Sequence, residues 1–132
     1  MAAIVELARE TKRYGKSVWE DPAFRQKIVQ IAIESQAGSA TGARNIARRR
    51  KGQLNPNMVS MTKNWSSELG VRRGDLALEI IGAYSQLMRD SKYAIDNGSW
   101  VYSILSRGGT IAEGTSEINR NIIAERILGL PR

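Results

Sequence analysis

The apolar residues of this chain recur every three or four positions, which is the spacing of helices with one buried face. In the first two segments this repeat is carried by Ile4, Leu7, Ala8 and Thr11, and then by Phe24, Ile28 and Ile31. We expect one helix from Ala2 to about Tyr14, ended by Gly15, and a second from Asp21-Pro22 to about Arg50. Proline suits the first helical position because the amide hydrogen that it lacks would have no helical partner there.

A third helical stripe follows a turn at residues 53–57. Its members are Met58, Met61, Trp65 and Leu69, and then Leu76, Ile80 and Tyr84. We interpret the Met58, Met61 and Trp65 part as core or subunit interface. Gly70 and Gly74 fall within this stripe, and we expect them to interrupt or soften the helix. Asn97-Gly98 then predicts a turn, and Ser99 can cap a short helix that runs to Leu105.

Short connections between long amphipathic helices favour an all-α fold, an antiparallel up-down four-helix bundle. The chain has 132 residues, which is enough for one domain with a core, and we expect residues 1–132 to form that single domain. The sequence contains no internal repeat and no segment whose alternation predicts a β-strand.

The last segment reads as a loop that delivers one carboxylate and then starts a helix. Gly108-Gly109 predicts a sharp turn, and Glu113 follows it. Either Thr115 or Ser116 can cap the final helix, with Glu117 in its first turn, where the helix dipole favours an anion. The final helix is expected to end at Gly129. By spacing alone, Glu113 is only an acid in a loop.

The amino-acid composition limits which catalytic groups and metal sites the chain can form. The chain has no cysteine and no histidine, which excludes disulfides, the usual zinc sites and triads built on histidine, and we expect no metal. Acid–base chemistry falls to Asp, Glu, Lys or Tyr. The net charge is +7, which suits an anionic partner. The first ten residues do not form a signal peptide, no stretch is apolar enough to span a membrane, and the expected compartment is the cytoplasm.

The literal string Glu113-Gly114-Thr115-Ser116-Glu117-Ile118, with the helix that follows it, is far more specific than its spacing. It resembles the C-terminal signature of the acyl-CoA dehydrogenases, flavoenzymes that desaturate acyl-CoA thioesters. The resemblance covers essentially the whole chain but only the C-terminal third of that family. The family's first C-terminal helix is longer at its N-terminal side, so this chain is expected to begin inside that helix as a truncated form.

The resemblance implies a role for each residue of this loop. Glu113 matches the family's catalytic base, which removes the α-proton of the thioester. Gly114 matches a position whose backbone lies against the substrate, and Thr115, Ser116 and Glu117 match positions that contact FAD. Some family members take the base from a preceding helix, whose matching segment would lie before Met1, so this alternative stays open.

A second segment, Glu79-Ile80-Ile81-Gly82-Ala83, resembles a family segment that reads Gln-x-x-Gly-Gly and touches the FAD of a neighbouring subunit. Glu79 and Ala83 depart from that pattern. The turn Arg13-Tyr14-Gly15-Lys16 also resembles the family's. The family's flavin-contacting arginine falls on Thr11, however, and a glutamine falls on Pro22. A charge from Arg9 or Arg13 is a possible replacement for that arginine.

The resemblance implies the C-terminal domain of an FAD-dependent enzyme that passes electrons to an electron-transfer flavoprotein. The N-terminal helical and middle β domains of that family are missing here, so the chain alone is expected to be inactive and to act within a homo- or hetero-oligomer, a dimer or tetramer. One alternative is a non-catalytic oligomerisation domain. The other is nucleic-acid binding through the basic run Arg48-Arg49-Arg50-Lys51, which lacks interleaved aromatics and is equally typical of a solvated helix end.

Overall fold

A computed structural model describes residues 1–88 and 90–131, apart from the side chains of residues 97, 101, 102, 104 and 105. The chain forms four α-helices, three 3₁₀ helices and one β-hairpin within the described residues. In order, these are α1 (Ala2–Glu10), β1 (Lys12–Arg13), β2 (Lys16–Ser17), η1 (Val18–Glu20), α2 (Pro22–Arg50), α3 (Met58–Ile81), η2 (Gly82–Gln86), η3 (Ile95–Thr110) and α4 (Ser116–Arg126).

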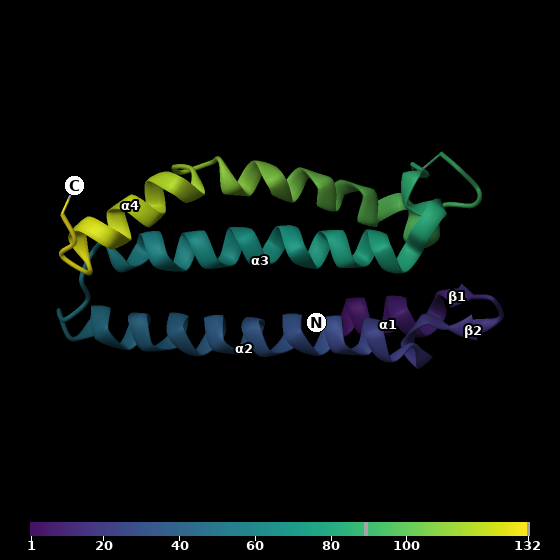
Figure 1. The fold of residues 1–132 in the computed structure, drawn as a ribbon, viewed down its shortest axis with the longest axis horizontal. Helices are drawn as coiled ribbons and strands as arrows, with labels where there is room; N and C mark the ends of the chain where they lie inside the picture. The colour runs from purple at the N-terminus through teal and green to yellow at the C-terminus, as the bar shows by residue number, and fades with distance from the viewer. Residues whose placement is uncertain (89, 132) are drawn as a thin grey trace.

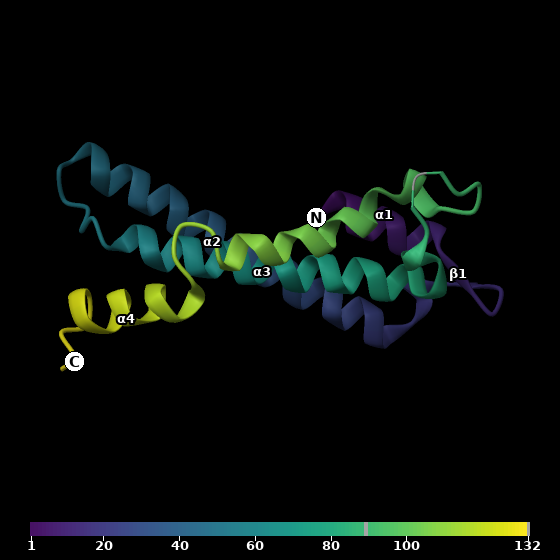
Figure 2. The same cartoon turned by 90° about the horizontal axis from the view of Figure 1, so that it is seen from above.

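The helices run up and down beside one another (Figure 1). α2 and α3 are antiparallel neighbours, and η3 followed by α4 returns along the other side of α3. Seen from above, α4 diverges from the line of η3 (Figure 2). The predicted all-α, antiparallel four-helix bundle is confirmed. Its last helical segment is formed by η3 and α4 together. The short α1 lies near the end of the bundle that carries the hairpin.

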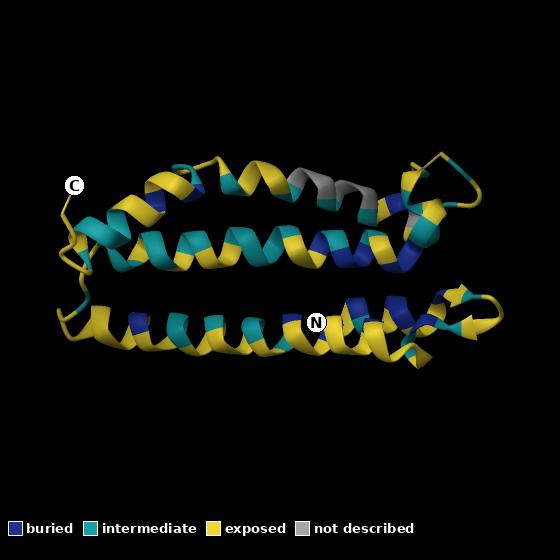
Figure 3. Cartoon of the chain, in the orientation of Figure 1, coloured by how far each residue is buried: buried dark blue, intermediate teal, exposed yellow. Residues whose placement is uncertain are grey.

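The fully buried core gathers at that same end (Figure 3). Its apolar members come from four elements. They are Ile4, Leu7 and Ala8 of α1, Val18 of η1, Phe24, Ile28 and Ile31 of α2, and Leu76, Ala77, Ile80 and Ile81 of α3. Burying each of the larger side chains contributes about 1.5–3 kcal/mol, so this cluster is the main source of stability. Toward the opposite end of the bundle, α2 and α3 carry mostly half-buried and exposed residues.

The start of α2 follows the sequence prediction. Asp21 is the cap, and its carboxylate accepts a hydrogen bond of 2.8 Å from the Ala23 amide, while Pro22 opens the first turn. The helix ends at Arg50, and Gly52 has φ +67°, a left-handed conformation that glycine adopts without strain. Both boundaries of this helix are confirmed.

The first helix is shorter than predicted, and the expectation that the chain contains no strand is wrong. α1 ends at Glu10, and a two-stranded antiparallel hairpin pairs Lys12 with Ser17. Its turn residues Tyr14 and Gly15 have φ of 51° and 80°, as in hairpin turns whose two central residues are both left-handed. Each strand has two residues, which is too short for an alternating pattern to be seen in the sequence.

Gly70 and Gly74 do not interrupt α3, which corrects the expectation that they would interrupt or soften it. α3 is continuous through Gly70 and Gly74, and it ends at Ile81, earlier than the stripe to Tyr84 predicted. Gly82 has φ +69° and opens η2. Gly74 is buried against Ser103 of η3, so its function is to allow two helices to approach closely.

The turns expected at Asn97-Gly98 and at Gly108-Gly109 also require correction. Both pairs lie inside η3, which is much longer than the short helix predicted from Ser99 to Leu105. Packing along α3 holds this segment helical, and tertiary contacts of this kind override local glycine preferences. The left-handed turn of the backbone occurs later, in the loop between η3 and α4.

Candidate functional site

The loop between η3 and α4 places Glu113 in a conformation that is uncommon for a residue with a side chain. Glu113 has φ 58°, and Gly114, which follows it, has φ 94°. A left-handed conformation costs a non-glycine residue about 1–2 kcal/mol, so the surrounding contacts must hold it. Glu113 is exposed. The predicted carboxylate is therefore exposed at a left-handed turn of the backbone.

Two side chains from other positions fix this loop. Lys63 of α3 donates to the carbonyl oxygen of Gly114 at 2.5 Å and to that of Thr110 at 3.4 Å. Asn119 of α4 donates from Nδ2 to the carbonyl oxygens of Gly114 and Thr115, each at 2.9 Å. Asn119 is only 3% exposed, so these bonds are shielded from water.

Sequence reasoning missed both Lys63 and Asn119. Lys63 is 51 residues from Gly114, and no local pattern links the two. Asn119 carried a usable signal, because an asparagine within the first helical turns after a Gly-Thr-Ser cap is placed to bond backward. A Cβ atom on Gly114 would lie 3.3 Å from Asn119 Nδ2, so both this contact and the positive φ require glycine.

The start of α4 is capped by Thr115, which decides between the two predicted caps. Thr115 Oγ1 accepts a hydrogen bond of 3.3 Å from the Ile118 amide. The Glu117 carboxylate accepts hydrogen bonds from its own backbone amide and from Thr115, and these hold the pKa of Glu117 below its usual value, with Arg120 a minor contributor. Ser116 is buried, and its hydroxyl has no hydrogen-bond partner among the described residues.

A cavity of about 370 Å³ is lined by Thr115, Ser116 and Glu117 together with residues of α3 and η3. The cavity also includes the cations Arg72 and Arg107, each of which pairs with a carboxylate elsewhere, Arg72 with Glu34 and Arg107 with Asp75. The lining is thus polar and carries both charges: two guanidinium groups, the Glu68 and Glu117 carboxylates, and the unpaired hydroxyl of Ser116.

The second predicted segment lies at the other end of α3, where it meets the hairpin. Arg13 donates to the carbonyl oxygen of Glu79, and its guanidinium lies 5.0 Å from the centre of the Phe24 ring. A Cβ atom on Gly82 would lie 3.1 Å from Arg13 Nη2, so glycine allows this approach. The Glu79 carboxylate pairs with Lys27 at 2.5 Å.

The hairpin and residues 81–83, the last part of that segment, together border a cavity of about 630 Å³. Its lining includes Thr11, Arg13, Gly82 and Ala83. The structure thus brings together two stretches that the sequence analysis treated separately. Of the two arginines considered there, Arg13 lines this cavity, whereas Arg9 packs over the Trp19 ring.

A family model for the C-terminal domain of acyl-CoA dehydrogenases matches residues 1–128. The chain belongs to the acyl-CoA dehydrogenase family. Acyl-CoA dehydrogenase IpdE1 of Mycolicibacterium smegmatis is 33% identical over 129 residues, which are 98% of this chain and 30% of that protein. The chain therefore spans about a third of the length of the curated relatives it matches.

Solved structures share this fold. The crystal structure of the ChsE4-ChsE5 complex from Mycobacterium tuberculosis superposes with a TM-score of 0.81 at 23% identity, covering 98% of this chain and 34% of that one. The FAD complex of PigA superposes with a TM-score of 0.79 at 22% identity, covering 98% of this chain and 32% of that one. At these identities the likeness shows the fold.

Within this acyl-CoA dehydrogenase domain, the two groups of predicted residues do not form one site. Lys63, which holds the Glu113 loop, and Glu79 are 16 residues apart on one continuous helix, or about 24 Å. Glu113 to Glu117 lie near the start of α3, whereas Glu79, Gly82 and Ala83 lie near its end. Thr115, Ser116 and Glu117 border one cavity, and Gly82 and Ala83 border another.

The structure of this acyl-CoA dehydrogenase domain also locates two other features of the sequence, the basic run and the stripe that contains Trp65. The basic run Arg48–Lys51 forms the exposed C-terminal end of α2. Trp65 is 43% exposed and Met61 is half-buried, so within this chain their stripe is not core but lines a groove. Among the residues that the structure describes, no helix combines the length and apolar character needed to cross a membrane.

Proposed function

We propose that residues 1–132 act as the C-terminal domain of a flavin-dependent enzyme that desaturates an acyl-CoA thioester between its α and β carbons. The observation that carries this proposal is the strained, exposed Glu113 held at the head of α4 by Lys63 and Asn119. A backbone conformation that costs energy and is fixed by donors from two helices is typical of a functional residue. Membership of the acyl-CoA dehydrogenase family supplies the reaction class.

In this proposal Glu113 is the catalytic base. Its carboxylate takes the α-proton while the β-hydrogen leaves with its electron pair, and a double bond forms between the two carbons. The hydride acceptor would be supplied by FAD. The backbone of Gly114 would lie against the substrate, as the family resemblance implies. Because Glu113 is exposed among the described residues, the protein that shields it from water must lie outside them.

The start of α4 fits the flavin cofactor. Ser116 offers a buried hydroxyl with no partner among the described residues, and Thr115 and Glu117 stand beside it at the helix N-terminus. These groups would hold polar or anionic parts of FAD. The FAD complex of a protein with the same fold supports this cofactor.

The other end of α3 would serve the FAD of a neighbouring subunit. Glu79, Gly82 and Ala83 lie too far along α3 to join the Glu113 loop, and Arg13 adds a cation beside them. We propose a homo- or hetero-oligomer, a dimer or tetramer, that acts in the cytoplasm and passes electrons to an electron-transfer flavoprotein. The other domains would come from protein beyond these residues, so the chain alone would be inactive.

The test uses the complete enzyme that contains this domain. Its visible spectrum is recorded for bound FAD, and acyl-CoA is added to wild type, to Glu113→Gln and to Glu6→Gln, which alters an exposed acid of α1 as a control. We expect bleaching of the flavin in wild type and the control, and none in Glu113→Gln with FAD still bound.

Other outcomes would contradict parts of the proposal. Equal bleaching in all three proteins would assign the base to a residue outside this chain and leave the loop as scaffold. Absence of flavin would favour a non-catalytic oligomerisation domain. The pairing of Glu79 with Lys27 is the observation that favours this second function, because it occupies a carboxylate where the family has an amide.

A further inference from the structure

One stretch of the chain carries many cations and no acid. Between Glu34 and Glu68 the sequence has no Asp or Glu, but it has six Lys or Arg residues, at positions 44, 48, 49, 50, 51 and 63. Five of these lie at or just after the C-terminal end of α2. We name residues 44–62 the basic tip, since they continue through the turn into the start of α3. The basic tip lies at the end of the bundle opposite the hairpin (Figure 1).

The cations at 44 and 48–51 are exposed and have no carboxylate partner within the described residues. Elsewhere on the surface, cations pair with acids, as in Lys27–Glu79, Arg107–Asp75 and Arg120–Glu68. A helix C-terminus favours cations only within its last turn. That effect accounts for the cations at 48–51, but it explains neither Arg44, almost two turns before the end of α2, nor the complete absence of acids nearby.

Exposed aliphatic side chains stand among these cations. Ile46 of α2 is 59% exposed, and Val59 of α3 is 65% exposed. Both line a small pocket of about 290 Å³ together with Arg49 and Leu54, so apolar side chains and a guanidinium group share one surface. A solvated helix end needs no exposed Ile or Val. The combination is typical of a surface that contacts something both anionic and apolar.

Asn45 adds an unsatisfied polar atom to the same pocket. Its side chain is buried, and Nδ2 donates to Thr62 Oγ1 at 3.4 Å. Asn45 Oδ1 has no hydrogen-bond partner among the described residues. Because a buried acceptor without a donor costs free energy, the pocket favours an occupant that carries a hydroxyl or ammonium donor.

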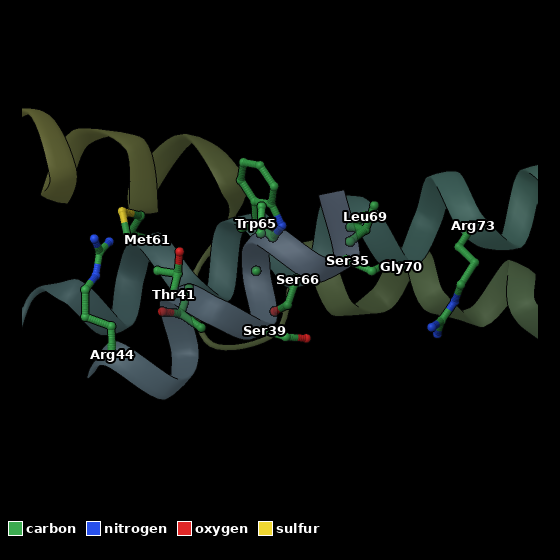
Figure 4. A pocket seen from close by; sticks show the side chains of 13 residues that line it. Ser35, Ser39, Thr41, Arg44, Met61, Trp65, Ser66, Leu69, Gly70 and Arg73 are labelled. Atoms are coloured by element: carbon green, nitrogen blue, oxygen red, sulfur yellow. The ribbon is translucent and has the colours of Figure 1, made fainter. Parts of the chain in front are cut away.

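The basic tip adjoins the groove that contains Trp65. Thr62 lines both this groove and the smaller pocket. Figure 4 shows Arg44 and Met61 toward one end of the groove and Arg73 toward the other. The mixture of cationic and apolar side chains therefore extends from the pocket to Arg44, over an area wider than one small ligand covers.

The side chains of the basic tip indicate which kind of anionic surface it fits. Single-stranded nucleic acid is bound by aromatic side chains that stack on the bases, and the cores of protein interfaces are also enriched in aromatic residues. Residues 44–62 contain no aromatic residue. A phospholipid surface requires only cations near its phosphates and aliphatic side chains at the boundary with the acyl chains.

We propose that the basic tip docks on an anionic phospholipid surface. Ile46 and Val59 enter the boundary between head groups and acyl chains, and the arginines lie among the lipid phosphates. A head-group donor satisfies Asn45 Oδ1. This inference goes beyond the proposed function and does not rest on it, because it involves neither Glu113 nor a flavin.

The test uses the complete enzyme that contains this domain and measures its co-sedimentation with vesicles. One set of vesicles is phosphatidylcholine alone, and the other has equal parts of phosphatidylcholine and phosphatidylglycerol. Two double variants alter the tip, Arg49→Gln with Arg50→Gln and Ile46→Ser with Val59→Ser. Matched controls remove the same side chains from exposed positions outside the tip: Lys16→Gln with Lys92→Gln, and Val29→Ser with Ile33→Ser.

We expect wild type to bind the vesicles that contain phosphatidylglycerol and not those of phosphatidylcholine alone. Losing two arginines should weaken binding about 10- to 30-fold, since each cation near an anionic surface contributes about fivefold. Ile46→Ser with Val59→Ser should weaken it about tenfold. Both control variants should bind like wild type. Circular dichroism should be unchanged in all four variants, because every altered side chain is exposed.

Four results would overturn the inference. The first is no binding to either kind of vesicle, and the second is an equal loss of binding in the tip and control variants. The third is displacement from the vesicles by acyl-CoA or inorganic phosphate, which would assign the cations to a free phosphate group. The fourth is tighter binding to an RNA oligonucleotide that depends on Arg49 and Arg50 but not on Ile46 and Val59. None of these readouts requires turnover, so their failure is separate from failure of the proposed function.

Discussion

Gly70 and Gly74 lie one turn apart on α3, yet alanine should have opposite effects at the two positions. Replacing a helical glycine by alanine contributes about 0.5–1 kcal/mol where nothing else changes. At Gly70 the added methyl group meets no atom within 4 Å, so Gly70→Ala should stabilise the chain by about that amount. At Gly74 it would lie 2.9 Å from Ser103 Cβ and 3.3 Å from the Ser103 carbonyl oxygen.

The contacts with Ser103 decide whether alanine at position 74 stabilises or destabilises the chain. A neighbouring side-chain tip can rotate away, but the Cβ and carbonyl of Ser103 move only with the backbone of η3. Overpacking of this kind costs about 1–3 kcal/mol, which exceeds the gain in helix propensity. We therefore expect Gly74→Ala to destabilise the chain by about 1–2 kcal/mol. In a thermal melt the two variants should move the midpoint in opposite directions, by about 3–5 °C per kcal/mol.

A double variant isolates the clash. Ser103→Gly removes the Cβ atom and the hydroxyl that Gly74→Ala would meet, at the usual propensity cost of about 1 kcal/mol. The double variant should be at least about 1 kcal/mol more stable than the sum of the single effects predicts. Urea denaturation measures all four proteins. If Gly74→Ala stabilised the chain as much as Gly70→Ala does, the close packing of α3 on η3 would be refuted.

Three further predictions concern the loop and the start of α4. Lys63→Met should cost about 1–2 kcal/mol and speed hydrogen exchange at the Asn119 amide, which donates to the Thr115 carbonyl next to this loop, whereas Lys63→Arg should retain most of the protection. Asn119→Asp should cost about 2–4 kcal/mol in denaturant titrations, because an acceptor replaces a donor facing two carbonyl groups. The folded pKa of Glu117 is lowered, so its contribution to stability is present above the unfolded pKa and is lost as pH falls through the folded value. Glu117→Gln should thus lower stability at neutral pH, and the difference from wild type should disappear as pH falls through the folded pKa. A carboxyl NMR titration of wild type should place the pKa of Glu117 below that of an unperturbed glutamate.

Sequence reasoning succeeded where local chemistry decides the structure. The Asp21-Pro22 start and the arginine-rich end of α2 were both located correctly, because caps and helix ends depend on neighbouring residues. Thr115 was one of two predicted caps for the same reason. The family resemblance of the last segment is equally local, and the match to the acyl-CoA dehydrogenase C-terminal domain confirms it.

Sequence reasoning failed where contacts between residues far apart in the chain determine the structure. Gly74 looks like a helix breaker until Ser103 is packed against it. Glycines at 108 and 109 predicted the turn, but the left-handed residues are Glu113 and Gly114, because Lys63 and Asn119 bond to the carbonyl of Gly114. The contact of Arg13 with Glu79 joins residues 66 positions apart, and no pattern in one sequence encodes it.

These long-range contacts give α3 a role that its composition does not suggest. Lys63 near its start fixes the Glu113 loop, and the carbonyl of Glu79 near its end receives Arg13. Because no glycine breaks the helix, Lys63 and Glu79 are held about 24 Å apart. A change that separates η3 from α3, such as Gly74→Ala, should therefore disturb the Glu113 loop, which η3 leads into, and leave Gly82 beside Arg13. In the proposed oligomer, such a variant would impair the base of one active site while leaving the contact to the neighbouring flavin in place.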